Sequence, residues 1–343
     1  MVAFEIEMGR KQLMLELLDK KELDEASSID EPLKHHYDVL FNEGWIKFNE
    51  IKWKLTHKKV NINGHEIEHP SLHSILFLNN NNRIVRPPMN PYLPLWFKTT
   101  PTNSKVRQQA QWLSACKALI NEFHIHDFKN TIFLPPMVTD IRPWQWAGLR
   151  ASVRYTYVID FPYHLGQAES EVRRKINKAQ KNGYLCERTT NMQHVYECLV
   201  STELRQGFKH HLTLDDLILA QELVGEEHLR AYVAYAPNGE PVSAEVILHS
   251  PYNYGYGWVC GNKKEHLKNG TNQYLMYYAM EDLNVNGSMG LDLCGANMPN
   301  VSQNKMGWGV DIKPYYTIDN YSIKTVTKWS RDWFRYSRLK WEV

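Results

Sequence analysis

The segment Gly290–Asp319, with the sequence GLDLCGANMPNVSQNKMGWGVDIKPYYTID, has a fainter copy in the first half of the chain. The earlier copy, Asn130–Asp160, reads NTIFLPPMVTDIRPWQWAGLRASVRYTYVID. Each copy begins with a short apolar run, continues through a polar loop to a tryptophan and a glycine, and ends in an aromatic strand that closes with Ile-Asp. Because this repeat is much longer than a solenoid unit, it predicts two similar domains fused in tandem.

Composition places the chain among folded globular proteins. Its 343 residues are enough for two domains with separate cores. Contents of 43% hydrophobic and 12% aromatic residues argue against disorder. The formal net charge of +2 is too small to indicate a nucleic-acid binder by itself. We therefore expect no DNA partner.

Cysteine usage and hydropathy predict a cytoplasmic location. The five cysteines form no C-x-x-C pair and are odd in number, which is typical of a reducing compartment. The N-terminal sequence MVAFEIEMGRKQLMLELLDKKELDE is charged throughout and has no signal-peptide core. No apolar run approaches the roughly 20 residues that a membrane-spanning helix needs, so we expect no membrane span.

The order of predicted elements indicates an α/β chain with a mixed α+β sheet. In the first half we predict strands at Trp45–Phe48, Lys52–Leu55, Ser71–Leu78 and Ile84–Arg86, and a helix at Ser104–Phe123. In the second half the predicted strands are Arg154–Phe161, His228–Tyr235, Pro241–His249, Tyr252–Cys260, Gly290–Leu293 and Tyr315–Tyr321, and the predicted helices are Ala168–Asn182, Gln193–Gln206, Leu214–Val224 and Thr271–Asn284. The strict alternation of a doubly wound parallel sheet is missing.

The repeat and these elements together predict three segments. Residues 1–152 form an N-terminal domain that shapes the cleft, and residues 153–322 form a second, catalytic domain. A tryptophan-rich helix in residues 323–343 is expected to pack back on the first domain.

Three motifs in the second half carry a family resemblance. The first is the helical segment Arg173-Arg-Lys-Ile-Asn-Lys-Ala-Gln-Lys-Asn-Gly183, and the second is the loop and helix start around Asn269-Gly-Thr-Asn272. The third is Leu291-Asp-Leu-Cys-Gly-Ala-Asn297, followed by Lys305-Met-Gly-Trp-Gly309. In this order they resemble the Gcn5-related N-acetyltransferase (GNAT) superfamily in its FemAB-like, duplicated form. The resemblance covers roughly residues 70–320 and implies two tandem GNAT-like acyl-CoA N-acyltransferase domains.

The resemblance also implies a donor site. In this fold two neighbouring parallel strands splay apart and the donor's pantetheine lies in the gap; here these would be Pro241–His249 and Tyr252–Cys260, with the strand after the helix. The helix that starts at Thr271 would offer its N-terminus to a pyrophosphate of acetyl-CoA or another acyl-CoA. The residues implied for this contact are Lys268, Asn269, Gly270, Thr271 and Asn272. Leu267 and Asn272 depart from the family's [Q/R]-x-x-G-x-[G/A] loop, and a plain Asn-Gly turn is the alternative.

Catalytic roles follow from the same resemblance. Lys305 matches a lysine placed near the reacting carbonyl, where its ammonium would stabilise an oxyanion; the alternative is a lysine whose stem packs on Trp308. Glu245 is implied as the group that deprotonates the acceptor amine. By alternation it shares a strand face with Ser243 and Ile247. Asp292 is a further polar candidate at the sheet ends.

Substrate contacts are implied at both ends of the second half. Arg173 or Arg174 would hold a phosphate or carboxylate of the substrate, although basic residues late in a helix are also what its dipole favours. The other implied contacts are Asn297, Tyr256 and Trp308, with the aromatic side chains lining an acceptor pocket. Aromatic residues in such strands are more often part of the core.

One motif suggests a metal and is better interpreted otherwise. His65-Glu-Ile-Glu-His69 matches H-E-x-x-H, but zinc binding by that motif needs both histidines on one helical face. Asn63-Gly64 precedes it and Pro70 follows, which indicates a turn and a strand. We therefore predict no metal site.

These features lead to one main hypothesis and two alternatives. The main hypothesis is an N-acyltransferase that moves an acyl group from acyl-CoA to an amine on an amino acid, amino sugar or peptide, by direct attack. The first alternative is an aminoacyl-tRNA-dependent transferase of the FemAB type, which the basic helix and the imperfect loop favour. The second is a catalytically inactive ligand-binding module. Lys305 and the Gly295-Ala-Asn297 turn belong only to the later repeat copy, so the second half is the expected active half.

Overall fold

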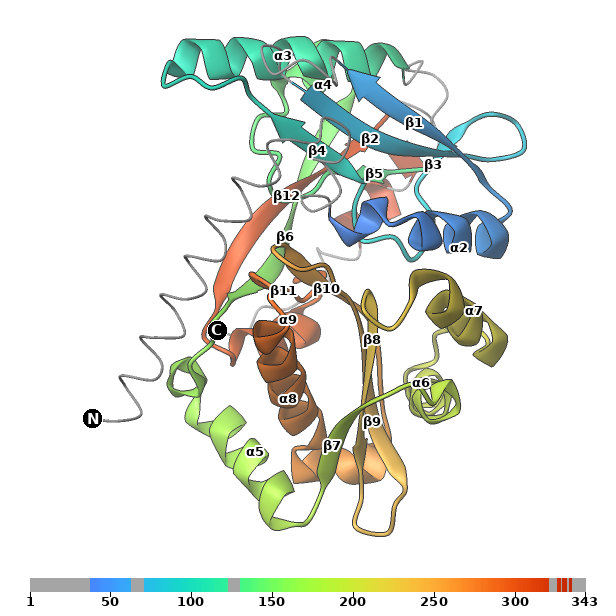
Figure 1. Cartoon of the computed structure of the whole chain (residues 1–343), viewed down its shortest axis with the longest axis vertical. Coiled ribbons are helices and arrows are strands. Elements are labelled where there is room, and N and C mark those ends of the chain that lie inside the picture. Colours follow the sequence, from blue (N-terminus) through green and yellow to red (C-terminus); the bar gives the residue numbers. More distant parts are fainter. Residues whose placement is uncertain are drawn as a thin grey trace, which may run out of the picture. The chain divides into compact units, whose positions relative to one another are not determined.

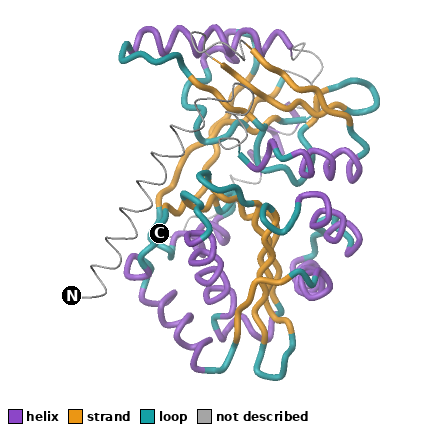
Figure 2. Tube along the Cα trace, viewed as in Figure 1, coloured by secondary structure: helices purple, strands orange, loops and turns teal. Residues whose placement is uncertain are grey.

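Two β-sheets form the framework of the described chain. The computed structural model describes residues 38–62, 71–122 and 130–320, together with 326, 327, 329–331, 333 and 334. The smaller sheet orders its strands β1-β2-β3, with β4 also paired to β2, and the larger orders them β5-β12-β6-β11-β10-β9-β8-β7. Figure 1 labels these elements, and Figure 2 separates helix, strand and loop along the same trace. The larger sheet combines a parallel β10–β11 pair with antiparallel neighbours, which confirms the predicted mixed α/β class.

The smaller sheet packs on the longest helix of the first half. Its strands are β1 (Thr56–Ile62), β2 (Ser71–Leu78), β3 (Ile84–Val85) and β4 (Leu95–Lys98). Helix α3 (Lys105–Glu122) buries Ala115, Cys116 and Leu119 in the same core as Leu72 and Leu76 of β2. The predicted helix and the predicted strand at Ser71–Leu78 are therefore confirmed, while β4 had not been predicted.

The first part of the described chain corrects two predictions. The strands predicted at Trp45–Phe48 and Lys52–Leu55 are wrong, because helix α2 (Glu43–Trp53) occupies this stretch. The Asn42 side chain caps α2 by accepting a hydrogen bond from the backbone N–H of Trp45 at 3.0 Å. Trp45 and Phe48 are aromatic residues that favour strands, but their spacing of three suits one helix face. Both pack edge-to-face against Trp258 of the larger sheet.

Helices cover both faces of the larger sheet in the second half. The remaining elements there are α5 (Ser170–Lys181), β7 (Leu185–Thr189), α6 (Met192–Gln206), α7 (Leu214–Val224), β8 (Leu229–Tyr235), β9 (Pro241–Leu248), β10 (Tyr254–Asn262) and α8 (Thr271–Val285). Helices α6 and α7 share one apolar core with the strands, and α5 and α8 share a second core on the opposite face (Figure 1). The predicted helices and the predicted strands of this region are confirmed to within a few residues, and β7 is an unpredicted edge strand.

The two repeat copies exchange strands. The earlier copy folds as β5 (Ile132–Phe133), α4 (Arg142–Trp146) and β6 (Arg150–Asp160), and the later copy as β11 (Gly290–Asp292), α9 (Pro299–Met306) and β12 (Asp311–Asp319). The short strand β5 pairs with the long strand of the later copy, β12, and the short strand β11 pairs with the long strand of the earlier copy, β6. The two long strands also pair with each other, so the copies are joined in one sheet.

Equivalent hydrogen bonds show that this exchange has two-fold pseudosymmetry. The backbone N–H of Leu134 donates to the carbonyl of Tyr316 at 2.8 Å, and that of Leu293 donates to the carbonyl of Tyr157 at 2.9 Å. The two donors, at positions 134 and 293, are 159 residues apart, and the two acceptors, at positions 157 and 316, are also 159 residues apart. Tyr155 and Pro314 are equivalent residues under the same offset, and they also pair with each other in the sheet. The pseudo-two-fold axis therefore passes between them. The domain boundary predicted between residues 152 and 153 falls inside β6 and stays a prediction.

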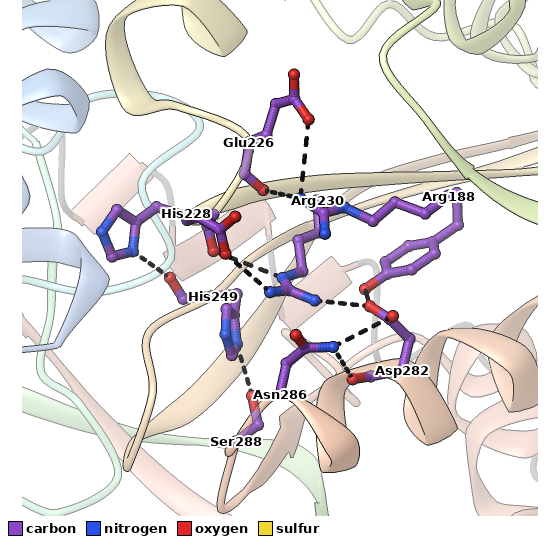
Figure 3. A network of polar contacts seen from close by, with 10 residues as sticks. Arg188, Glu226, His228, Arg230, His249, Asp282, Asn286 and Ser288 are labelled. Carbon is purple, nitrogen blue, oxygen red and sulfur yellow. Dashed lines mark hydrogen bonds and ion pairs between the residues drawn. The ribbon is translucent and has the colours of Figure 1, made fainter.

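A polar network closes the end of the β8–β9 pair against α8 (Figure 3). Arg230, only 1% exposed, donates to the Asp282 carboxylate at 2.8 Å, and the Tyr232 hydroxyl donates to the same oxygen at 2.7 Å. Directly after the neighbouring strand β9, the imidazole Nδ1 of His249 lies 2.7 Å from the hydroxyl of Ser288. Burial, with the nearby Arg230, lowers the pKa of His249 to about 4. The buried cation Arg230 is thus compensated by a carboxylate from the packed helix.

Some predictions fall on residues whose structure is not described. The H-E-x-x-H sequence at residues 65–69 lies outside the described residues, as does most of the predicted C-terminal helix. Within that helix, the ring of Trp329 lies 3.1 Å from the guanidinium carbon of Arg150 at the start of β6. No helix among the described residues combines the length and the apolar character that crossing a membrane requires. The described residues also contain no group of three or more His, Cys, Asp or Glu suited to a metal ion.

Candidate active site

The parallel pair β10–β11 opens at its far end. The two strands pair only from Tyr254 with Gly290 to Tyr256 with Asp292, whereas β10 continues to Asn262. A β-bulge follows in β10 between Gly257 and Val259. The prediction that Pro241–His249 and Tyr252–Cys260 are parallel neighbours is wrong, because β9 and β10 are antiparallel. The parallel neighbour of β10 is β11, and the two strands are no longer paired beyond Tyr256 and Asp292. We call this unpaired end of the two strands the β10–β11 gap.

Gly257 is the first residue of β10 beyond the part that pairs with β11. A Cβ atom built on it would lie 3.5 Å from the Glu245 Oε1, 3.7 Å from the carbonyl oxygen of Asp292 and 3.9 Å from the Cα of Leu293. These are ordinary van der Waals distances. Gly257 therefore lies between the carboxyl group of β9 and the end of β11, where a side chain would fill space rather than clash.

Glu245 is a buried carboxyl group with a strongly perturbed pKa. Ala244, Val246 and Leu248 belong to the α6–α7 core and Ile247 to the α5–α8 core, so the predicted face of Glu245 is confirmed. Glu245 is 6% exposed, and no hydrogen-bond donor among the described residues contacts its carboxylate. Burial raises the pKa of Glu245 to about 8, and the positive charge of Lys305 opposes this rise. A carboxyl group with this pKa can exchange a proton near neutral pH.

Lys305 is anchored at the end of β11. From α9 its ammonium donates to the backbone carbonyl of Leu293, and to that of Gly295 at 2.8 Å. These carbonyls flank Cys294, whose backbone is left-handed with a φ of 53°. A lysine ammonium has three N–H donors, so two bonds leave one donor for a ligand atom. The anchoring fixes the charge at the mouth of the β10–β11 gap.

Asp292 holds this end of the site together. Its carboxylate accepts hydrogen bonds from the Thr156 hydroxyl at 2.5 Å, the Tyr92 hydroxyl at 2.8 Å and the backbone N–H of Cys294 at 2.7 Å. The residue is 2% exposed, and burial raises its pKa although these bonds oppose the rise. Because its oxygens are occupied and buried, Asp292 fits a positioning role better than contact with substrate.

Tyr256 has a partner that the sequence did not indicate. Its hydroxyl donates to the carboxylate of Asp38, which also caps the short 3-10 helix η2 (Val39–Phe41) by accepting from Leu40 N–H at 2.8 Å. Burial raises the pKa of Asp38 to about 6 and that of Tyr256 well above its usual value. The only sequence signal for Asp38 is a capping pattern before a helical turn, which says nothing of a partner 218 residues away.

Asn297 and Trp308 lie in structural positions. The Asn297 side chain accepts from the backbone N–H of Tyr155 and donates to its carbonyl, both at 3.0 Å, and so extends the sheet at the pseudosymmetry axis. Trp308 is 5% exposed and its ring packs against Tyr163, whose hydroxyl donates to the Trp308 carbonyl at 2.6 Å. In this structure the Trp308 ring is part of the α5–α8 core and is not open to a ligand.

The start of α8 offers uncapped backbone amides. Gly270 has a φ of 81° and precedes the helix, and no side chain caps the first turn. A Cβ on Gly270 would lie 2.2 Å from the carbonyl oxygen of Lys175, so α5 packs directly on this loop. Lys178 donates to the carbonyl of Lys268 at 2.9 Å, and Asn269 donates to the hydroxyl of Tyr184 at 2.8 Å. The first turn of α8 thus has no side-chain cap at Gly270, and Lys178 and Lys268 lie beside it. A helix N-terminus of this kind favours an anion.

The predicted arginines on α5 differ in their surroundings. Arg173 donates to the backbone carbonyls of Gly166, at 3.1 Å, and Ala168, so it stabilises the loop before the helix. Arg174 forms a two-point ion pair with Glu171 at 2.8 and 2.9 Å on the exposed surface. A surface pocket of about 520 Å³ runs along this helix and is lined by Ser170, Arg173, Arg174, Asn177, Lys178, Lys181 and Asn182. The helix is therefore an open basic surface.

Comparison with known proteins supports the resemblance inferred from the motifs. Residues 167–300 match the family model described as an acetyltransferase (GNAT) domain. This range includes Glu245, Gly270 and Asp292 but stops short of Lys305. No curated protein matches the chain.

Three solved structures have similar folds. FemX has a TM-score of 0.60 at 11% identity, with coverage of 86% of this chain and 95% of FemX. The C-terminal domain of a putative lysylphosphatidylglycerol synthetase from Agrobacterium fabrum scores 0.54 at 9% identity, covering 86% and 91%. The L-PGS from Bacillus licheniformis scores 0.52 at 10% identity, covering 82% and 90%. At such identities the likeness shows the fold, and it extends across both halves of the chain.

Proposed function

We propose that this chain, an acyltransferase with a GNAT domain in a FemAB-like fold, transfers an acyl group from acyl-CoA to an amine by direct attack. The observation that supports this most is the placement of two groups at the open end of β10–β11. Lys305 holds a positive charge there, and Glu245 supplies a buried carboxyl group on the adjoining face of β9. Oxyanion stabilisation and proton removal are the two tasks that amide formation from an activated acyl group requires.

The chain's own residues account for the chemical step. Lys305 directs its remaining N–H at the acyl oxygen and stabilises the negative charge that develops as the amine attacks. Ionised Glu245 accepts the proton that the amine loses. A C–N bond forms, the bond from the carbonyl carbon to the donor's leaving atom breaks, and the proton passes from Glu245 to that leaving group. Asp292 and Tyr92 hold the end of β11 in place during these changes.

Acyl-CoA is favoured as the donor by the uncapped amides at the start of α8. They lie on the helix that follows β10, and Lys178 adds positive charge beside them. Leu267 and Asn272 depart from the usual loop, but backbone amides bind an anion whatever side chains they carry. The anchored Lys305 also speaks against an inactive binding module, since such a module would have no use for a fixed ammonium at the gap.

A second candidate donor is aminoacyl-tRNA. The basic surface of α5, with Arg174, Lys178 and Lys181 along one pocket, would suit a phosphate backbone. The FemAB-like resemblance implies the same donor class. This candidate predicts a steep loss of activity with salt, because each phosphate contact releases counterions.

One experiment separates these donors. Transfer of labelled acetyl from acetyl-CoA, and of a labelled amino acid from aminoacyl-tRNA, is measured by mass spectrometry on a mixture of amino acids, amino sugars and short peptides. The proposal expects product with acetyl-CoA that ribonuclease treatment leaves unchanged. Product that forms only from aminoacyl-tRNA and disappears with ribonuclease would replace acyl-CoA by the second candidate.

A further inference from the structure

Two arginines near the pseudosymmetry axis stack on one aromatic ring. The guanidinium carbon of Arg86 lies 4.1 Å from the ring centroid of Phe133, and that of Arg154 lies 5.8 Å from the same centroid. Arg154 on β6 is the strand partner of Tyr315 on β12, so the side chains of Arg154 and Tyr315 lie on the same face of the sheet. Two guanidinium groups therefore approach the same aromatic ring.

Among the described residues, neither arginine has an acidic partner. No carboxylate of the described residues lies within ion-pair distance of Arg86 or Arg154, although both are partly buried. Arg86 donates through Nη1 to the backbone carbonyls of Pro87, Pro88 and Asn90, and its buried Nε has no partner among the described residues. Burial, with the charge of Arg154, lowers the pKa of Arg86 to about 10. Cations brought together away from water are unfavourable unless an anion compensates them.

The chain treats another buried arginine differently. Arg230 is paired with Asp282 at 2.8 Å and with Glu227 at 3.3 Å, as Figure 3 shows for the first pair. The comparison indicates that the described residues do not supply a compensating anion at Arg86 and Arg154. An external anionic group would complete the site, because a planar guanidinium binds carboxylate or phosphate through parallel hydrogen bonds.

The arginine pair is connected to the candidate active site. Arg154 lies two residues from Thr156 on β6, about 7 Å along the strand, and the Thr156 hydroxyl donates to Asp292. Tyr315 packs edge-to-face on Tyr92 with centroids 5.3 Å apart, and Tyr92 donates to the same carboxylate. An anion bound at Arg154 would thus be separated from the end of β11 by roughly the length of a small substrate.

We propose that Arg86 and Arg154 bind an anionic group, a carboxylate or a phosphate, of the acyl acceptor. This inference rests on the proposed acyl transfer for the identity of the ligand, but the binding of the anion itself does not. The acceptor is then an amine that also carries a negative charge, and the arginine pair selects it over neutral amines.

Binding can be measured at the arginines themselves. The protein is labelled with 15N-arginine, and the side-chain Nε–Hε signals of Arg86 and Arg154 are assigned from the variants Arg86→Lys and Arg154→Gln. Inorganic phosphate and, separately, acetate are titrated to about 50 mM, which detects dissociation constants in the millimolar range, at constant ionic strength. We expect both signals to shift saturably with at least one probe, while the signal of Arg107 on α3 stays in place; the stronger probe identifies the anion class.

The variant Arg154→Gln provides the decisive comparison, because the side chain of Arg154 makes no hydrogen bond to the described residues and its loss leaves the loop of Arg86 intact. We expect the Arg86 signal in this variant to need at least tenfold more of the same probe, whereas Arg107→Gln changes nothing. Signals that do not move with either probe, or an Arg86 shift with unchanged midpoint in Arg154→Gln, would overturn the proposal. This titration measures binding and not turnover, so its result is independent of the acyl-transfer assay. Anion binding in a chain that transfers no acyl group would count against the proposed function alone. Acyl transfer in a chain that binds no anion at these arginines would count against this inference alone.

Discussion

Phe133 and Asp292 occupy equivalent positions in the two copies of the repeat. Phe133 pairs with Thr317 of β12, and Asp292 pairs with Val158 of β6, under the same offset of 159 residues. In the earlier copy this position holds an aromatic ring covered by two arginines, and in the later copy it holds a buried carboxylate that accepts three hydrogen bonds. The duplicated framework has therefore acquired different chemistry at its two ends.

Replacement of Glu245 by Gln tests the proton acceptor. In the wild type we expect activity to rise with pH and to level off above about 8, because the fraction of ionised Glu245 follows its raised pKa. The variant should lose activity by about 10²-fold or more and lose this pH dependence. A pH profile of kcat with the same inflection in Glu245→Gln would exclude Glu245 as the base.

The same carboxyl group makes a separate prediction about stability. Its pKa in the folded chain, about 8, exceeds the usual value of 4.5, so the folded state binds more protons than the unfolded state between these pH values. The stability contributed by protonated Glu245 is complete below pH 4.5 and is lost as pH rises to 8. The melting temperature of Glu245→Gln relative to the wild type should therefore increase from pH 5 to pH 8, in thermal unfolding followed by circular dichroism. A constant difference would contradict the burial of this group.

Replacement by alanine should affect stability at one glycine of β10 and not at another. A Cβ at Gly261 would lie 2.4 Å from backbone atoms of Cys198 in α6, and we expect Gly261→Ala to lower the free energy of unfolding by about 3 kcal/mol. Gly257→Ala meets only ordinary contacts and should stay within about 1 kcal/mol of the wild type.

The activity of Gly257→Ala then reports on the gap between β10 and β11. The added methyl group lies beside Glu245, so we expect transfer of larger acyl groups to fall more than transfer of acetyl. Urea unfolding and transfer rates for two acyl lengths check both statements. An equal effect on both acyl lengths would place the acyl group elsewhere.

The Arg230–Asp282 pair should be important for stability but not for chemistry. Asp282→Asn leaves Arg230 buried without a full counter-charge, and such a change typically costs about 3–5 kcal/mol. The matched control is Glu227→Gln, because Glu227 contacts the same guanidinium at 3.3 Å but its side chain is 79% exposed. We expect urea unfolding to separate the two variants by at least about 2 kcal/mol. Equal losses would mean that the buried ion pair is not what stabilises this end of the sheet.

The sequence was most informative where local signals and burial agree. Helix α7 was predicted with its exact ends, because Thr213 forms a capping box with Asp216 and Gly225 follows the last turn. Helix α2 was missed, because its aromatic residues favour strands and only packing on Trp258 explains their helical spacing. The strand exchange itself was not predictable, since a repeat shows that copies exist but not which strands pair.

The candidate site was predictable only in part for the same reason. Lys305 and Glu245 followed from the family resemblance, and strand alternation added only the face on which Glu245 lies. The Asp38–Tyr256 contact and the two arginines on Phe133 join residues that are distant in sequence and belong to no motif. Trp308 was inferred as a substrate contact from its neighbours in sequence, whereas its place in the core depends on Tyr163 and α5.

Lys305→Ala provides the most direct test of the central claim, that acyl transfer takes place at the open end of β10–β11. The measurement is the single-turnover rate of amide formation from acetyl-CoA under saturating donor, compared with the wild type and with Lys105→Ala at the exposed start of α3. We expect the rate of Lys105→Ala to be unchanged and that of Lys305→Ala to fall by about 10²–10³-fold, the usual effect of removing one oxyanion donor. An unchanged rate in a folded Lys305→Ala variant would contradict the claim.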